Sequence, residues 1–297
     1  MSDLPHALLP PLANTLRHLG DSSSIQSAGW LPGGCINHAM RLQTGQGVYL
    51  LKWNSNPLPG LFLAEADGLR RLAHTHTVRV PEVLAVTGPG EDYPAYILLE
   101  WLSGPPPGPA AEETLGAQLA ELHRQGTAPA YGLDDDNYLG SVHQHNAWQP
   151  DWVTFFADCR LRPQMELAGR LGHLPAARAR RLAHLIEHLG DHLAGVERRP
   201  ALIHGDLWGG NVIPGPAGLA LIDPAVSYSD RETEIAYTEL FGGFSARFYA
   251  GYQSVWPLEP GYPRRRDLYN LYHLLNHLNH FGERYGPQVD AVLQIYR

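Results

Sequence analysis

Three acidic or amide residues lie within one short stretch of the chain at a spacing that could support chemistry. Asp206 is followed by Asn211, and Asp223 comes after two short apolar runs separated by a Pro/Gly-rich turn at 214–218. Apolar runs on either side of such a turn predict a β-hairpin. We expect this hairpin to bring the three side chains near one another at its base.

These residue types are those that phosphoryl transfer requires. The reaction needs a carboxylate that accepts the proton of the acceptor hydroxyl, and oxygen ligands that hold Mg²⁺ against the phosphates. We expect Asp206 to act as the base and Asn211 and Asp223 to bind Mg²⁺. Capping and turn formation explain many single Asp and Asn residues. The full pattern, with His204 two residues before Asp206, is typical of kinase catalytic loops.

A lysine and a glutamate earlier in the chain match the same chemistry. Lys52 is the only lysine in the sequence and lies in the apolar run Val48–Trp53, which predicts a strand. Kinases use a lysine at this point to hold the α and β phosphates, and they pair it with a glutamate from the next helix. The helix expected at 59–75 supplies Glu65 beside its apolar face. The alternative is that Lys52 and Glu65 are unrelated solvated charges on the surfaces of a strand and a helix.

A glycine pair precedes that strand. Gly33 and Gly34 would let backbone N–H groups approach phosphates without obstruction by a Cβ atom. Taken alone, such a pair is usually a hairpin turn, and the surrounding motifs favour the phosphate-binding interpretation. Cys35, in the same turn, is either an accessible thiol whose oxidation would obstruct ATP or a small buried strand residue.

The stretch HGDLWGGN followed by IDP resembles the aminoglycoside phosphotransferase and choline kinase superfamily, and Trp208 narrows the resemblance to the fructosamine kinase (ketosamine-3-kinase) family. The similarity runs from about residue 20 to the end of the chain. Further agreement lies in Gly33–Asn37, Val48–Lys52, Ala64–Leu69, Asp136–Gly140, Asp151–Phe156 and Thr238–Phe244. A departure follows the metal-binding aspartate, where Ser229–Glu232 replaces the Gly-His pair of many members.

The resemblance implies an α+β, two-lobed, protein-kinase-like fold. Residues 1–102 would form a nucleotide-binding lobe with a small antiparallel sheet and a helix, and 111–297 a mainly helical lobe for catalysis and substrate. Residues 103–110 would be the linker after the hinge, since their prolines can continue neither a helix nor a sheet. The residues implied in ATP binding are Gly33, Gly34, Cys35, Asn37, Lys52, Glu65 and, at the hinge, Glu100, Trp101 and Leu102.

The resemblance also implies the acceptor, the C3 hydroxyl of a small or protein-bound ketosamine, so that phosphorylation would reverse glycation. Trp208 would hold the apolar face of the sugar, or else brace the loop as a core tryptophan. Asp136 and Asn137 lie in the segment 131–149, which we expect to be irregular, and long loops tend to be functional. We therefore assign both to the substrate.

Two other functions fit parts of the sequence. One is a kinase of another small alcohol, such as an aminoglycoside, choline or homoserine, for which the acidic run Asp134–Asp136 could form a pocket. The other is a pseudokinase that binds nucleotide without chemistry, although such a module would not need the base Asp206. Phosphorylation assays on these alcohols would distinguish the possibilities.

Composition excludes several classes of partner. The net charge is −8 and the pI about 6.0 over 297 residues, so no basic field attracts nucleic acid or an anionic membrane. Two cysteines cannot form a disulfide framework, and neither a signal sequence nor a membrane-spanning run is recognisable. We expect a reducing, cytoplasmic setting.

The rest of the chain is expected to be largely helical. Helices are predicted at 111–125, 150–171, 175–194, 230–242, 244–254 and 263–281. Arg178, Arg180 and Arg181 are expected on a solvated helix face. In the last helix His273 and His277 are four residues apart, as in some metal sites, but packing in a Leu/Tyr/Asn-rich helix is the favoured interpretation.

Overall fold

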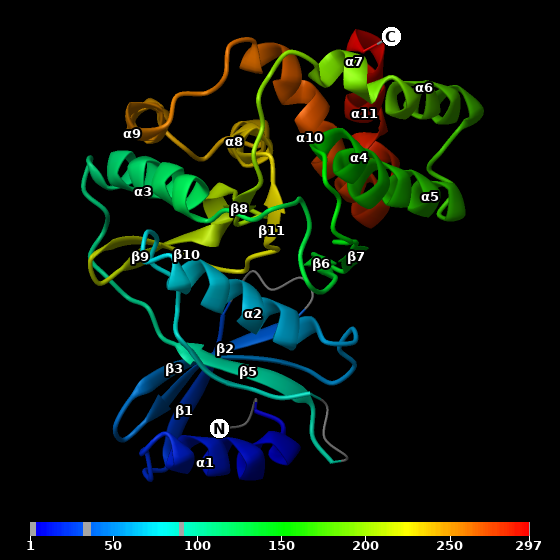
Figure 1. Ribbon diagram of the computed structural model, residues 1–297. Coiled ribbons are helices and arrows are strands. Elements are labelled where there is room, and N and C mark those ends of the chain that lie inside the picture. Colours follow the sequence, from blue (N-terminus) through cyan, green and yellow to red (C-terminus); the bar gives the residue numbers. More distant parts are fainter. Residues whose placement is uncertain (1–3, 32–36, 89–91, 297) are drawn as a thin grey trace. The chain divides into compact units, whose positions relative to one another are not determined.

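The computed structural model describes residues 4–31, 37–88 and 92–296. The chain forms two compact units, one of residues 1–107 and 213–223, the other of residues 108–212 and 224–297 (Figure 1). The division at 107–108 falls within the stretch predicted as the linker. The hairpin 213–223 joins the first unit, whereas the sequence analysis placed it with the helical lobe.

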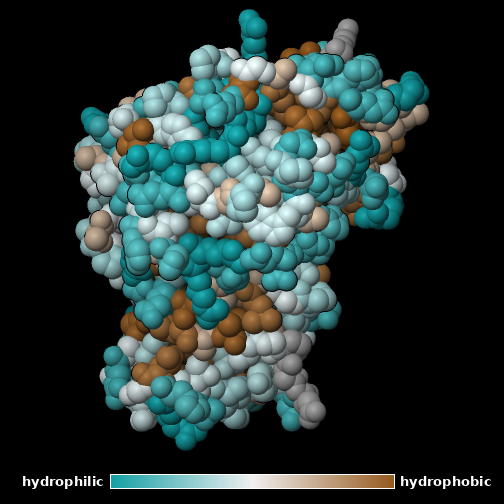
Figure 2. Space-filling model, viewed as in Figure 1, coloured by the Kyte–Doolittle hydropathy of each residue, from teal (hydrophilic) through white to brown (hydrophobic). Residues whose placement is uncertain are grey.

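The first unit is built around a five-stranded antiparallel sheet. Its strands, in the spatial order β1-β2-β3-β5-β4, are β1 (Ile25–Trp30), β2 (His38–Thr44), β3 (Val48–Asn54), β5 (Ala95–Glu100) and β4 (Val83–Val86). The helices are α1 (Leu9–His18), preceded by a 3₁₀ turn at His6–Leu8, and α2 (Leu61–His74). On the face seen in Figure 2, apolar surface gathers over the sheet of this unit.

The alternation of side chains along β3 determines what each face of the sheet contacts. Leu51 and Trp53 belong to the core that packs against α1, through residues such as Leu12 and Leu16. Because successive strand residues point to opposite faces, Lys52 points away from that core. Its ammonium group meets the side chain of Glu65, which α2 presents.

A two-stranded hairpin of β9 (Val212–Gly215) and β10 (Gly218–Leu221) completes the first unit. It agrees with the hairpin predicted from the apolar runs on either side of 214–218. The amide of Leu221 donates to the carbonyl oxygen of Arg79 at 2.8 Å, which joins β10 to the segment before β4.

The second unit is mainly helical. Its helices are α3 (Ala111–Gln125), α4 (Trp152–Phe156), α5 (Arg162–Arg170), α6 (Ala176–Glu187), α7 (Leu189–Leu193), α8 (Arg231–Leu240), α9 (Ala246–Val255), α10 (Tyr262–Phe281) and α11 (Gly286–Ile295). A π-helical segment, Ala157–Leu161, joins α4 to α5, and 3₁₀ turns lie at Gly209–Asn211 and Glu283–Tyr285. Two small antiparallel ladders pair β8 (Ala201–Ile203) with β11 (Ser227–Ser229) and β6 (Asn137–Leu139) with β7 (Val142–Gln144).

The structure corrects two expectations in this unit. The segment 131–149 is not wholly irregular, because it contains the β6–β7 hairpin. Arg178 does not lie on a solvated face: its side chain is 2% exposed and pairs with Glu283 and Asp290 at 2.7 and 2.9 Å. Both acids lie more than 100 residues further along the chain, where local periodicity cannot indicate them.

Helices α3 and α9 approach each other closely where each carries a glycine. A Cβ atom added to Gly116 would lie 1.9 Å from the carbonyl oxygen of Phe248, and one added to Gly251 would lie 1.9 Å from that of Glu113. Only glycine permits this backbone contact. None of the helices in the described part of the chain combines the length and the apolar character that a membrane crossing needs.

We predict that Gly116→Ala destabilises the fold by about 1–3 kcal/mol, because the added methyl group must separate α3 from α9. The matched control is Gly169→Ala in α5, where the nearest atom to the added Cβ is 3.9 Å away. That change should be neutral or stabilising by up to about 1 kcal/mol, since alanine favours helix. Urea unfolding of the two variants measures the difference, and equal stabilities would contradict the packing argument.

Candidate active site

The predicted catalytic loop begins where β8 ends. His204 is buried, and Gly205 follows in the left-handed region with φ of 83°. A Cβ atom at Gly205 would lie 2.0 Å from the carbonyl oxygen of Ala225, so glycine is needed for both conformation and space. The turn leaves Asp206 partly exposed at the surface of the second unit.

A buried glutamate fixes this loop. The carboxylate of Glu234, from α8, accepts hydrogen bonds from the amides of His204 and Gly205 at 3.0 and 2.7 Å. It is also bonded to Nε2 of His123, from α3, at 2.9 Å, and both side chains are inaccessible to solvent. Burial alone would raise the pKa of Glu234, but the hydrogen bond and charge of His123 and the bonds from the loop hold it below its ordinary value.

Asn211 is hydrogen-bonded to Asp206. Its Nδ2 donates to the backbone oxygen of Asp206 at 2.8 Å and to the carboxylate Oδ2 at 3.2 Å. The side chain is buried at the end of the 3₁₀ turn Gly209–Asn211. Because the nitrogen is engaged with Asp206, the amide oxygen of Asn211 is the atom that would bind a cation. The structure thus brings together two of the residues predicted from the motif.

Tyr237 is a neighbour of Asp206 that the sequence analysis did not identify. Burial, followed by the charge of Asp206, raises the pKa of the Tyr237 phenol above its ordinary value. The ring of Tyr237 stacks on His273 with a centroid separation of 3.6 Å. His273 is therefore a packed residue of α10, in agreement with the interpretation favoured for this helix.

The first unit holds the other predicted charged residues. Lys52 Nζ donates to Glu65 at 2.7 Å and to the carboxylate of Asp223. Burial alone would lower the pKa of Lys52, but the two carboxylates raise it above its ordinary value, so the lysine stays charged. The sequence prediction that Glu65 approaches Lys52 agrees with this contact. The structure adds Asp223 as a second partner.

Asp223 adopts an uncommon backbone conformation. Its φ is 58°, in the left-handed region that non-glycine residues rarely occupy, although aspartate tolerates it better than most. Such residues gather at functional sites, where the surrounding structure holds them in place. Here the ion pair with Lys52 ties the side chain to β3.

The end of β5 carries the predicted hinge residues. The Glu100 carboxylate is paired with Arg79, and the guanidinium of Arg41 lies 5.5 Å from the ring centre of Trp101. Leu102 is buried, and both it and Trp101 lie beyond the last ladder residue. Their backbone groups are thus outside the sheet pairing. The assignment of these residues to adenine stays a prediction.

The glycine-rich turn is only partly described. Gly33, Gly34 and Cys35 lie outside the described residues, so their assignment to phosphate binding, and the proposed redox role of Cys35, stay predictions. Asn37 is described, and its Oδ1 accepts a hydrogen bond from Asn54 Nδ2 at 3.0 Å. This bond connects Asn37 to the end of β3.

The predicted substrate residues differ in their accessibility. Trp208 is 44% exposed, which excludes the alternative of a core tryptophan. Its ring lies over Gly210, where an added Cβ would be 2.2 Å from the indole. Asp136 is also exposed, but Asn137 is buried: its Oδ1 accepts from Gln144 and its Nδ2 donates to a backbone oxygen. A role of Asn137 in substrate binding would therefore be indirect.

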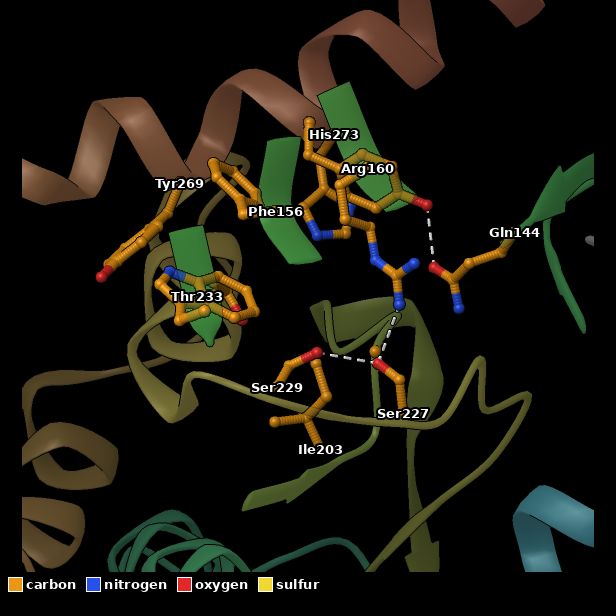
Figure 3. A pocket seen from close by; sticks show the side chains of 12 residues that line it. Gln144, Phe156, Arg160, Ile203, Ser227, Ser229, Thr233, Tyr269 and His273 are labelled. Atoms are coloured by element: carbon orange, nitrogen blue, oxygen red, sulfur yellow. Dashed lines mark hydrogen bonds between the residues drawn. The ribbon is translucent and has the colours of Figure 1, made fainter. Parts of the chain in front are cut away.

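A small cavity adjoins the catalytic loop in the second unit (Figure 3). Gly205 and Ile203 line it together with the buried Arg160, whose Nη2 donates to Ser227 Oγ at 3.0 Å. Its volume is about 20 Å³, which is room for about one water molecule. The cavity is too small for a sugar and is not the substrate pocket.

The segment Ser229–Glu232, whose role the motif comparison left open, anchors α8. Asp230 caps the helix by accepting from the amide of Glu232 at 3.0 Å, and it also accepts from Tyr269 at 2.7 Å. Glu232 pairs with Arg265 at 2.8 Å, and both side chains are buried. These bonds fix the helix that carries Glu234. No local pattern indicates that burial, because the partners come from helices far along the chain.

The fold is of the protein-kinase-like class. The aminoglycoside phosphotransferase APH(4)-Ia shares the fold, with a TM-score of 0.65 over 99% of this chain and 100% of that chain at 16% identity. The predicted α+β kinase-like fold is thereby confirmed.

The chain belongs to the fructosamine kinase family, whose model matches residues 12–296. It is 42% identical to a probable ketoamine kinase from Enterococcus faecium over 88% of this chain and 92% of that protein. A solved structure assigned as a fructosamine-3-kinase from Haemophilus somnus has a TM-score of 0.85 and 28% identity, with 95% of each chain covered. The resemblance seen in the sequence and the assignment as an enzyme are confirmed.

We predict that Glu234→Gln lowers the free energy of unfolding by about 1–3 kcal/mol, because the amide cannot accept from all three donors and leaves a buried N–H group unpaired. Since the pKa of Glu234 is lowered in the folded state, the benefit of its ionisation is complete above the ordinary glutamate pKa and shrinks as the pH falls below it. Denaturant unfolding across this pH range measures the free energy of unfolding of each variant. The control is Glu113→Gln, at a side chain that is 51% exposed. Equal, pH-independent losses in both variants would contradict the role of Glu234.

Proposed function

We propose that this protein is an ATP-dependent kinase that phosphorylates the C3 hydroxyl of a ketosamine, the rearranged adduct of a sugar and an amine. The observation that carries the proposal is the pair of hydrogen bonds from Asn211 to Asp206 on a loop whose amides are bound by Glu234. The names of the relatives, ketoamine kinase and fructosamine-3-kinase, support the choice of acceptor.

In this proposal Asp206 accepts the proton of the C3 hydroxyl as the oxygen attacks the γ-phosphorus of ATP, and the bond from this phosphorus to the β–γ bridging oxygen breaks to release ADP. Its carboxylate is partly exposed, as a base that must meet a substrate needs to be. The bond to Asn211 limits rotation of the carboxylate and so helps to orient it.

Lys52 is assigned to the phosphates of ATP. It is held charged by Glu65 and Asp223, so a permanent positive charge is available for the α and β phosphates. The amide oxygen of Asn211 and the carboxylate of Asp223 are hard oxygen donors of the kind that Mg²⁺ prefers, and we assign both to that ion. When bound, Mg²⁺ neutralises charge on the transferred phosphate.

The phosphorylated product would break down by elimination and hydrolysis. A phosphate on C3 can leave after the C2 ketone enolises towards C1, because the enol electrons expel it. Hydrolysis of the resulting compound releases the amine. Phosphorylation would thereby reverse glycation of small amines or of proteins. We place this activity in the cytoplasm, where the buried thiol of Cys159 would remain reduced.

Product analysis tests the proposal. The purified protein is incubated with ATP, Mg²⁺ and fructosamine, ribulosamine or erythrulosamine, with aminoglycosides, choline and homoserine as competing acceptors. We expect phosphate on C3 of a ketosamine, located by phosphorus–proton NMR. Phosphate on another hydroxyl, or rapid turnover of choline or an aminoglycoside beside none of any ketosamine, would overturn it.

We predict that Asp206→Asn lowers kcat by about 10²–10⁴-fold while the fold and ATP binding are kept, because the amide preserves shape but cannot accept the proton. Asp158→Asn is the matched control, since this aspartate is 48% exposed and pairs with Arg162, four residues further along the chain. Turnover and ATP binding are measured separately. Near-full kcat in Asp206→Asn would exclude it as the base.

We predict that Trp208→Leu raises KM for the ketosamine much more than KM for ATP, because the exposed ring is free to contact the apolar face of a sugar. Thermal stability should change little. Trp148→Leu, at a tryptophan that is 40% exposed, is the control and should leave both constants near those of the parent. A parallel rise of both KM values with a loss of stability would show that Trp208 is structural.

A further inference from the structure

Three potential metal ligands gather on the surface of the second unit, and one of them, Asp136, is also a predicted substrate residue. They are the carboxylate of Asp136 and the imidazoles of His143 and His145, all exposed. One ligand atom from each lies within 4.8 Å of the other two. Nothing in the proposed kinase reaction uses the two histidines.

The β6–β7 hairpin explains why these residues meet. Asn137 is paired with Gln144 across the ladder, so one step further along the strands Asp136 comes beside His145. His143 and His145 are two residues apart, and side chains at this spacing on a strand share a face. The hairpin thus brings the side chains of Asp136, His143 and His145 together.

Two distances within the cluster match those between the ligands of a tetrahedral metal ion. His143 Nε2 and His145 Nδ1 each lie 3.4 Å from the same carboxylate oxygen, Oδ2 of Asp136. With metal–ligand bonds of about 2.0–2.2 Å, two ligands of a tetrahedral Zn²⁺ ion are roughly 3.3–3.5 Å apart. We propose that Asp136, His143 and His145 bind one divalent transition-metal ion, with water in the fourth position.

The ligands are held in place by the surrounding structure. The other carboxylate oxygen of Asp136 accepts from the amide of Asn146 at 2.7 Å, which leaves Oδ2 to face the histidines. Arg160, buried in the core (Figure 3), bonds the carbonyl oxygen of His145 and the side chain of Asn146. Such second contacts orient metal ligands and strengthen binding. Metal binding therefore requires little rearrangement of the backbone.

The donor set indicates which metal is bound. Two imidazole nitrogens and one carboxylate suit Zn²⁺ and its neighbours among the transition metals, whereas Mg²⁺ prefers oxygen ligands. The site is therefore distinct from the Mg²⁺ ligands assigned to phosphoryl transfer, and the inference does not depend on the proposed function. An ion there would join Asp136, before β6, to the end of β7.

A second group of potential ligands must be removed before the test. His184, Glu187 and His188 lie within 4.8 Å of one another at the end of α6. The parent protein for the experiment is therefore the full chain carrying His184→Ala and His188→Ala, without an affinity tag and freed of metal by a chelator.

We predict that this parent binds one equivalent of Zn²⁺, measured by calorimetry, and that Mg²⁺ at millimolar concentration does not compete. Co²⁺ in place of Zn²⁺ should give the visible absorption of a site with nitrogen ligands. His143→Ala, His145→Ala and Asp136→Asn should each weaken Zn²⁺ binding by at least about tenfold. The matched control His18→Ala, at an exposed histidine of α1, should leave it unchanged.

Asp136→Asn keeps an oxygen for the Asn146 amide, so this variant should fold even if a histidine variant does not. Circular dichroism establishes folding, and Zn²⁺ should raise the melting temperature of the parent but not of the three ligand variants. No Zn²⁺ binding by the parent, or affinity in the folded Asp136→Asn variant equal to that of the parent, would overturn the proposal. The cluster would then be an ion-paired surface group only.

Discussion

The loop predicted to be catalytic depends on the hydrogen bonds of one carboxylate, that of Glu234. It has no access to solvent, and it accepts from two successive backbone amides and from His123. A buried carboxylate is costly unless its hydrogen bonds are satisfied, and here they are satisfied by the turn that presents Asp206. Because the amides of His204 and Gly205 donate to Glu234, they do not need water as a hydrogen-bond partner. The loop is therefore held in place by a buried residue of α8.

The position of Glu234 follows in turn from the charged residues at the start of α8. Asp230 caps the helix and is bound by Arg198 and Tyr269, while Glu232 is paired with Arg265. Removal of one partner from such a group leaves an uncompensated buried charge, which is strongly destabilising. Stability of the helix and orientation of the catalytic loop are thus maintained by the same contacts. In the first unit, Lys52 is likewise a buried charge that is compensated by partners, here the carboxylates of Glu65 and Asp223.

The sequence predicts what depends on local spacing and fails where contacts join distant segments. Turn residues at 214–218 between apolar runs predict the β9–β10 hairpin, and strand alternation with helical periodicity predicts that Lys52 meets Glu65. Glu234 and Arg178 are different, since each is buried only because its partners arrive from remote parts of the chain. The β6–β7 hairpin was missed because its strands are three residues long, too short for a clear alternation.

Amide hydrogen exchange tests the role of Glu234 most directly. The amides of His204 and Gly205 are both bonded to Glu234, so their protection reports on this contact. We expect both amides to exchange as slowly as those of β8 in the unaltered protein. In Glu234→Gln they should exchange fast while β8 stays protected. Fast exchange at His204 and Gly205 in the unaltered protein would contradict the claim that Glu234 holds the catalytic loop.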